Sequence, residues 1–213
     1  MTNNSLTTSF KFQVSSFKLV VIGVSAGGMK ALPEVLSPLP SGFPIPIAVV
    51  QHISPHSDNR YFVTHLNQRI KIHVKEADEK ETIQTEHVYI APPNYHLLIE
   101  NDRNFALSVD EKVNYSRPSI DVLFETAAEV YGTGLIGVIL TGASSDGANG
   151  LKRIKKNGGV AIVQDPDTAE AKIMPQSAID ACEVDYMLSL EEIGSLLKNL
   201  GTGGGNLKLD VGS

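Results

Sequence analysis

An apolar run at residues 19–22, Leu-Val-Val-Ile, leads directly into the pattern Gly-Val-Ser-Ala-Gly at residues 23–27. This order predicts a buried strand, a sharp turn that carries Ser25, and a helix that begins near Gly28. Such a turn projects the serine hydroxyl at the carboxyl edge of a sheet, where the free N–H groups of the helix favour a developing negative charge. The feature therefore predicts an α/β sheet with a candidate nucleophile at its edge.

The pattern by itself equally fits a tight strand-to-helix turn with a surface serine. Two phosphate-binding interpretations fail on named residues. A dinucleotide fingerprint has glycine where Ser25 stands and an acidic residue after the second strand, which is here followed by Gln51 and His52. A P-loop ends in Lys-Ser or Lys-Thr, whereas this chain has Lys30 followed by Ala31.

The composition of the chain limits the class of protein. Its 213 residues, 42% hydrophobic and 20% charged, suit one large or two small globular domains. The net charge of −6 gives no general attraction to nucleic acid or to an anionic membrane, and the apolar stretches are too short for membrane insertion. The single cysteine, Cys182, is expected to be a small buried side chain, and its lack of a partner fits a reducing cytoplasm.

Strand-like and helix-like segments alternate along most of the chain. Strands are predicted at residues 18–23, 46–50, 135–140, 160–163 and 186–188, and helices at residues 30–36, 59–68, 120–131, 151–156, 175–182 and 189–200. The region 71–108 is different, because its short strand-like segments are joined by turns, which predicts hairpins. The expected fold class is therefore α/β: a doubly wound, mostly parallel sheet with helices on both faces and an inserted antiparallel hairpin region.

The domain limits follow from composition. Residues 18–200 are predicted to form the catalytic domain, after a polar, disordered leader at residues 1–17 and before a flexible, glycine-rich tail at residues 201–213. Ser119 is expected to cap the helix at 120–131. A capping box is expected to open the last helix, at residues 189–192.

Three predicted strand ends carry residues that could act together, namely Ser25, His52 and Asp146. A serine hydroxyl needs a base to take its proton, and an imidazole base needs a carboxylate to fix its tautomer. Taken singly, His52 also fits a solvated histidine and Asp146 a turn or capping aspartate. Asp165 is a rival for the carboxylate, but the glycine-rich turn before Asp146 favours the latter, because it can bring N–H groups toward the reacting carbon.

Competing site types are argued against by order and spacing. The common esterase fold has the order Ser…Asp…His, and this chain has Ser…His…Asp. A patatin-like lipase pairs an early G-x-S-x-G with a later Asp-Gly-Ala, but the upstream glycine cluster of its oxyanion loop is absent. His56 follows His52 by four residues, but Pro55 breaks any helix that would align them, so no metal or cofactor is expected.

Seven blocks in order make one resemblance specific. They are Ser25-Ala26-Gly27-Gly28, Gln51-His52, Ala91-Pro92-Pro93 with His96, Arg117-Pro118-Ser119 with Asp121, Leu140-Thr141-Gly142 with Asp146-Gly147-Ala148, Gln164-Asp165 and Met174-Pro175. Over about residues 18–200 the chain resembles the catalytic domain of the chemotaxis receptor methylesterases, the CheB family.

The resemblance implies hydrolysis of glutamate γ-methyl esters on methyl-accepting chemoreceptor proteins, with release of methanol, and deamidation of certain glutamines. It implies Ser25 as the nucleophile that forms an acyl-enzyme, His52 as base and acid, and Asp146 as the carboxylate that orients the imidazole.

The resemblance also implies that the N–H groups of Ala26 and Ala143 bind the oxyanion, and that Arg117 and Met174 are candidates for the substrate cleft. The chain departs from the family where the usual Thr-Gly-Met-Gly becomes Thr-Gly-Ala-Ser at residues 141–144. This departure leaves open a catalytically weak binding or scaffold domain.

Members of the resembled family usually carry an amino-terminal phosphoacceptor domain that covers the active site. Only 17 residues precede the first predicted strand, too few for such a domain. We therefore expect an open active site, with control by a separate regulatory partner or by a domain outside this sequence.

Overall fold

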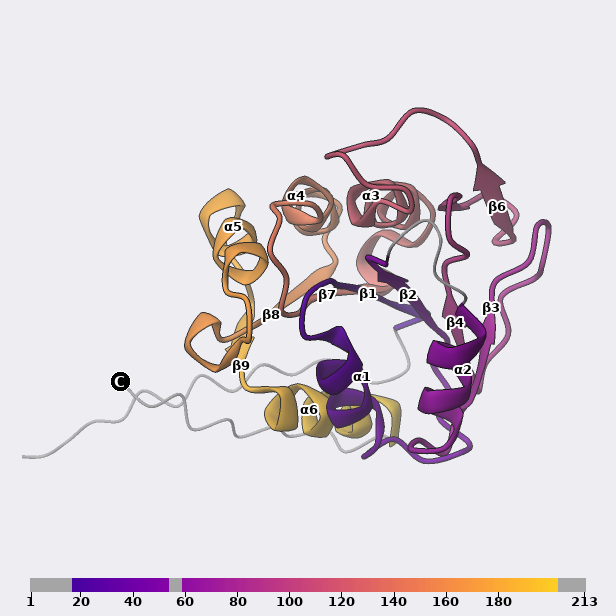
Figure 1. The fold of residues 1–213 in the computed structure, drawn as a ribbon, viewed down its shortest axis with the longest axis horizontal. Helices are drawn as coiled ribbons and strands as arrows, with labels where there is room; N and C mark the ends of the chain where they lie inside the picture. The colour runs from indigo at the N-terminus through magenta and orange to yellow at the C-terminus, as the bar shows by residue number, and fades with distance from the viewer. Residues whose placement is uncertain (1–16, 54–58, 203–213) are drawn as a thin grey trace, which may run out of the picture.

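The central feature of the fold is a seven-stranded parallel sheet, seen in a computed structural model that describes residues 17–53 and 59–202 (Figure 1). The strand order is β3-β4-β2-β1-β7-β8-β9. The bounds are β1 (Leu19–Val24), β2 (Ile47–Gln51), β3 (His73–Glu76), β4 (His87–Ile90), β7 (Leu135–Ile139), β8 (Val160–Gln164) and β9 (Tyr186–Leu188). Every residue of β1, β2, β7 and β8 is buried, as their continuous apolar runs require in a sheet covered on both faces.

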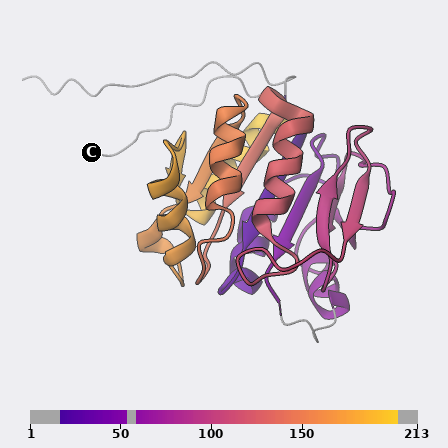
Figure 2. The same cartoon turned by 90° about the horizontal axis from the view of Figure 1, so that it is seen from above.

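Three helices cover each face of the sheet. One face packs against α1 (Gly28–Leu36), α2 (Asn59–Asn67) and α6 (Leu190–Thr202), and the other against α3 (Ile120–Tyr131), α4 (Ala148–Lys156) and α5 (Ile173–Ala181). Figure 2 shows α5, α4 and α3 side by side over their face. Alternate residues of β1 serve the two cores, since Val20 and Ile22 face α1 while Leu19 and Val21 face α3. The predicted doubly wound fold class is confirmed.

The hairpin prediction for the middle region is correct only in part. The antiparallel pair consists of β5 (His96–Ile99) and β6 (Phe105–Ser108), which lies against α3. Strands β3 and β4 belong instead to the main sheet and run parallel to each other and to β2. The segment 77–86 that joins them is a crossover without a helix, and it is held against β6 by backbone bonds between Lys80 and Phe105 and between Glu81 and Phe105.

The ends of the predicted domain extend slightly further than expected. Phe17, placed in the leader by sequence, is buried in the core, and α6 continues into the predicted tail as far as Thr202. The remainder of the predicted leader and tail lies outside the described residues. The capping box at the start of α6 is confirmed, because Ser189 and Glu192 each bond the other's backbone N–H. Within the described ranges, no helix is long and apolar enough to cross a membrane.

The sheet changes its direction of winding between β1 and β7. From β1 the chain crosses through α1 to β2 on one side, and from β7 it crosses through α4 to β8 on the other side and the other face. Ligands in such sheets bind at the carboxyl ends of the strands at this switch point. The turn after β1 and the loop after β7 meet there, where the Ser25 N–H donates to the Thr141 carbonyl at 2.9 Å.

Candidate active site

The three predicted site residues follow neighbouring strand ends. Val24 is paired with Gln51 across β1 and β2, so Ser25 and His52 leave adjacent strands at the same level. The N–H of His52 donates to the Val24 carbonyl at 3.0 Å, which fixes the backbone of the histidine beside the serine turn. Asp146 lies in the loop after β7, on the other side of β1. The structure therefore gathers these residues at one edge of the sheet.

Asp146 is fully buried and densely hydrogen-bonded. Its carboxylate accepts five hydrogen bonds at 2.7–3.2 Å, from the side chains of His52, Asn114 and Ser119 and from the backbone N–H groups of Ile120 and Asp121. Two of these donors are the first N–H groups of α3, whose positive end favours an anion. Ser119 was expected to cap α3, but its hydroxyl donates to Asp146, and the aspartate takes the capping role from across the chain.

Two neighbouring carboxyl groups differ in pKa. Burial tends to raise the pKa of Asp146, but the bonds from His52, Asn114, the Ile120 N–H and Ser119 together outweigh it and hold this pKa below its usual value. Burial raises the pKa of Asp121, and the nearby charge of Asp146 adds to that rise against the bond from the Gly150 N–H. Asp146 is accordingly the one kept as an anion.

The hydrogen bond to Asp146 sets the tautomer of His52. Its Nε2 lies 2.8 Å from Oδ2 of Asp146, and an ionised carboxylate can only accept, so Nε2 carries the proton. The side chain is 13% exposed, and Nδ1 is left as the unprotonated nitrogen. The Ser25 hydroxyl makes no hydrogen bond to any described residue and is free to turn toward this nitrogen.

The turn that carries Ser25 offers unpaired N–H groups. Ala26 and Ala143 are both exposed, and neither N–H donates to another residue in the described part of the chain. The turn is held by Gly27, whose φ of +86° favours glycine, and by the Thr141 hydroxyl, which donates to the Ala26 carbonyl at 2.8 Å. Both N–H groups are therefore available to a ligand's oxygen, as expected for an oxyanion site.

Gln51 is a further residue of the site, one that sequence reasoning treated only as part of a motif. Its amide nitrogen donates to the carbonyls of Ser25 and His52, both at 2.9 Å, and so ties the serine turn to the histidine. Its amide oxygen occupies the space where a side chain on Gly28 would lie, which explains the glycine at the start of α1.

The two cleft candidates have contacts that differ from those expected. One guanidinium nitrogen of Arg117 donates to the carbonyls of Val109 and Asp110, within its own loop. Met174 is buried and packs under Gly142, because the register of α5 turns it inward while Ile173 faces solvent. The sequence offers no pattern that distinguishes these buried or loop-closing roles from a role in the cleft.

The remaining candidates lie apart from His52. Asp165 accepts from the N–H of Asp167 and caps a short 3-10 turn. Cys182 is half-buried, and burial raises the pKa of its thiol. His56 lies outside the described residues. Among the residues that are described, no group of three or more His, Cys, Asp or Glu side chains could hold a metal ion.

A cavity of about 290 Å³ opens beside the serine turn. Gly27 and Thr141 line it on the side of the turn, and the charged residues Lys30 and Glu170 lie on its other sides. It offers room for a polar side chain next to Ser25.

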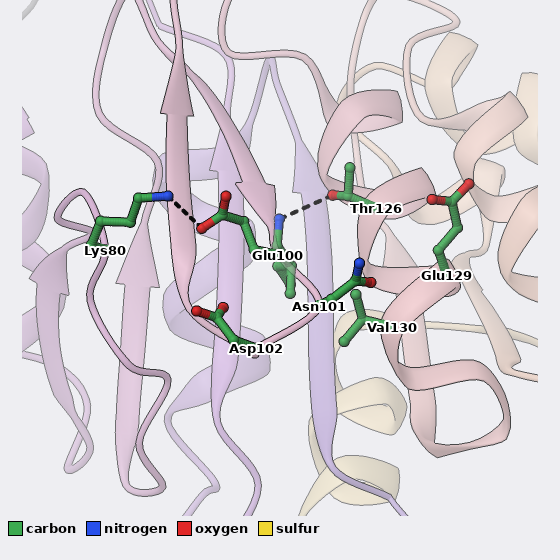
Figure 3. Close-up of a pocket in the computed structure, with 8 residues that line it drawn as sticks. Lys80, Glu100, Asn101, Asp102, Thr126, Glu129 and Val130 are labelled. Atoms are coloured by element: carbon green, nitrogen blue, oxygen red, sulfur yellow. Dashed lines mark hydrogen bonds and ion pairs between the residues drawn. The ribbon is translucent and has the colours of Figure 1, made fainter.

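A second cavity, of about 560 Å³, lies at the other end of α3 (Figure 3). Lys80 points to Glu100 and bonds it at 2.6 Å, and the Ile99 N–H donates to the Thr126 hydroxyl at 3.2 Å. These contacts fasten the β5–β6 hairpin to its neighbours, so we assign this cavity a structural role.

Comparison with known proteins decides the family. The family described as CheB methylesterase matches residues 20–197. This chain belongs to the CheB methylesterase family. A relative from Leptospira interrogans is 60% identical over 185 residues, which cover 87% of this chain and 95% of the relative.

Other members of the CheB methylesterase family are longer than this chain. A Thermotoga maritima protein named protein-glutamate methylesterase/protein-glutamine glutaminase is 37% identical over 87% of this chain and 54% of its own length. A Burkholderia pseudomallei protein of the same name, numbered 1, is 41% identical over 84% of this chain and 50% of its own. The crystal structure of the Thermotoga maritima CheB methylesterase catalytic domain superimposes with a TM-score of 0.83 at 38% identity, covering 87% of this chain and 99% of that domain. The shared region is thus a CheB catalytic domain.

Proposed function

We propose that this chain is a serine hydrolase that demethylates glutamate γ-methyl esters on chemoreceptor proteins, with Ser25, His52 and Asp146 as its triad. The observation that carries the proposal is the 2.8 Å bond from His52 to the buried Asp146 carboxylate, beside the strand end that bears Ser25. Membership of the CheB methylesterase family supports the reaction class.

In the proposed reaction, Nδ1 of His52 takes the proton of Ser25 as the serine oxygen attacks the ester carbonyl. Asp146 stabilises the imidazolium through its bond to Nε2–H. The N–H groups of Ala26 and Ala143 donate to the oxyanion. The tetrahedral intermediate then expels the methoxy group, which receives the proton from His52 and leaves as methanol.

The glutamyl ester left on Ser25 is hydrolysed by the same steps. Water takes the place of the serine hydroxyl, gives its proton to His52, and attacks the acyl carbon. The carboxylate of glutamate leaves, and Ser25 recovers its proton. A glutamine side chain would give the same acyl-enzyme with ammonia as the leaving group, which agrees with the double name of the relatives.

The partner that we infer is a methylated segment of a chemoreceptor, met in the cytoplasm. Family membership supports the partner, and the single cysteine with no disulfide is consistent with a reducing compartment. Arg117 and Met174 stay candidates for shaping the cleft, Arg117 by closing the loop at 109–118 and Met174 by supporting Gly142 from below.

A second candidate, a scaffold without turnover, is favoured by one observation. Ser144 stands where the family usually has glycine, and its hydroxyl is buried with no partner among the described residues. A changed oxyanion loop could bind receptor without efficient catalysis.

Methanol release from methylated chemoreceptor separates these candidates. Wild-type protein should release methanol, Ser25→Ala should not, and Ser145→Ala, a change of an exposed serine in the loop after β7, should match the wild type. No methanol above the Ser25→Ala level would favour the scaffold. Fatty acid released from phospholipid in place of methanol would favour a lipid esterase.

A further inference from the structure

One asparagine joins two buried carboxylates beside the candidate histidine. The amide nitrogen of Asn114 donates to Oδ1 of Asp146 at 2.9 Å and to Oδ2 of Asp121 at 2.8 Å. Both aspartates are buried, Asp146 completely and Asp121 to 97% (3% exposed). A single NH2 group thus supplies one hydrogen to each of two like charges.

The loop around Asn114 is shaped to present this amide. Asn114 and Tyr115 both have positive φ, +50° and +63°, in the left-handed region that asparagine enters more readily than most residues. Arg117 closes the same loop by donating to the carbonyls of Val109 and Asp110. The residue itself is exposed, so the side chain reaches inward from a loop that otherwise faces solvent.

The surroundings of the pair contain few compensating charges. His52 faces Asp146 from the end of β2, and Asp121 and Glu125 face it from α3. His96, from β5, is one step removed, because its ring accepts from the Ser119 N–H. Among the described residues that hydrogen-bond Asp146 or Asp121, none is a lysine or arginine.

We propose that Asn114 is a positioning residue of the site, which keeps Asp146 ionised and aimed at His52 in spite of the second carboxylate beside it. The inference rests on the proposed function of Ser25, His52 and Asp146. Without the amide, two buried carboxylates would face each other with fewer donors between them. Like charges at close range take up a proton, and a protonated Asp146 no longer stabilises the imidazolium.

The direction of the pH effect follows from this argument. Loss of a hydrogen bond to the charged form makes ionisation harder and raises the pKa of Asp146. The fraction of Asp146 that is ionised then falls at a higher pH than in the wild type. The acid limb of the pH profile of kcat/KM should therefore move upward and become steeper.

Asn114→Gly is the sharpest test, because glycine keeps the positive φ without strain and removes only the amide. Asn114→Asp keeps the shape and puts a third carboxylate between the other two. Glu86→Gly is the matched control: Glu86 also has a positive φ, +64°, and precedes β4, at the opposite edge of the sheet from Asp146. The measurements are methanol release from pH 5 to 9 and ¹³C NMR titration of the aspartate carboxyl groups.

For Asn114→Gly we expect kcat/KM to fall about 10-fold on the plateau, the worth of one hydrogen bond to a charged group. We expect the acid limb and the carboxyl titration of Asp146 to move up by about one pH unit. Asn114→Asp should lose more activity than Asn114→Gly, and Glu86→Gly should match the wild type.

Two results would overturn the proposal. One is a wild-type plateau and acid limb in Asn114→Gly. The other is a lowered plateau with an unmoved acid limb and an unmoved titration of Asp146, which would make Asn114 merely a loop residue. If the wild-type protein itself releases no methanol, the proposed function fails, and the NMR titration still decides the role of Asn114.

Discussion

The carboxylate side and the nucleophile side of the candidate site are built in opposite ways. Asp146 is completely buried and accepts five hydrogen bonds. Ser25 is partly exposed, its hydroxyl has no partner among the described residues, and the neighbouring Ala26 N–H is also free. The comparison teaches that the fold orients the charged group in advance and leaves the reacting groups unpaired for a substrate.

The largest expected effect compares one substitution on each side. Ser25→Ala should lower the rate of methanol release by several orders of magnitude at an unchanged melting temperature, because the hydroxyl contributes no hydrogen bond to the fold. Asp146→Asn should lower the rate by up to about 10⁴-fold, and it should also lower the free energy of unfolding by about 3 kcal/mol, since buried N–H donors lose an acceptor.

The measurements for this pair are single-turnover or steady-state rates together with thermal unfolding. Asp165→Asn serves as the matched control, because Asp165 caps a separate turn and has no bond to His52. Equal stability losses in Ser25→Ala and Asp146→Asn would contradict the contrast between the two sides. A large rate loss in Asp165→Asn with a normal Asp146→Asn would transfer the carboxylate role.

A smaller effect concerns the dependence of stability on pH, and it divides Asp121 from Asp146. The folded pKa of Asp146 is lowered below 3.8, so its stabilising contribution is complete above about pH 4 and is lost as pH falls through its folded value. The folded pKa of Asp121 is raised above 3.8, so folding favours its protonated form and stability declines as pH rises from 3.8 through the folded value.

Melting temperatures at pH 4 to 7 for wild type, Asp121→Asn and Asp146→Asn test this division. The difference between wild type and Asp121→Asn should change over this range, and the difference between wild type and Asp146→Asn should stay nearly constant. The reverse assignment would show that Asp121 is the anion of the pair and would remove the reason for placing Asp146 opposite His52.

The sequence predicts regular elements far better than it predicts the loop contacts that complete the site. The helix at Ile120–Tyr131 has the predicted bounds, because its apolar residues recur with the helical period. Strands β3 and β4 were taken for hairpins, because short strands joined by turns look alike whether they pair with each other or each join a larger sheet. Only their register on β2 decides, and register is a long-range property.

The site shows the same division. Ser25, His52 and Asp146 were found because strand ends meet at one edge of a parallel sheet, which is a rule of topology. Asn114 was missed, because the loop at 109–118 has no periodicity and its amide contacts a residue 32 positions away. Ser119 was interpreted from its local position as a helix cap, while its hydroxyl bonds a carboxylate 27 positions away.

The smallest expected effect lies on the open side, at Ala143. Its side chain is exposed and its N–H has no partner in the described part of the chain. If the backbone alone binds the oxyanion, Ala143→Met, which restores the residue usual in the family, should change kcat less than about threefold, whereas loss of an oxyanion donor costs about 10²-fold or more. KM is free to change, because a methionine side chain would lie where the substrate approaches. Parallel measurement of kcat and KM for methanol release checks this. A 10²-fold change of kcat in either direction would mean that the side chain at this position takes part in the transition state, and the open side would then be as finely shaped as the buried one.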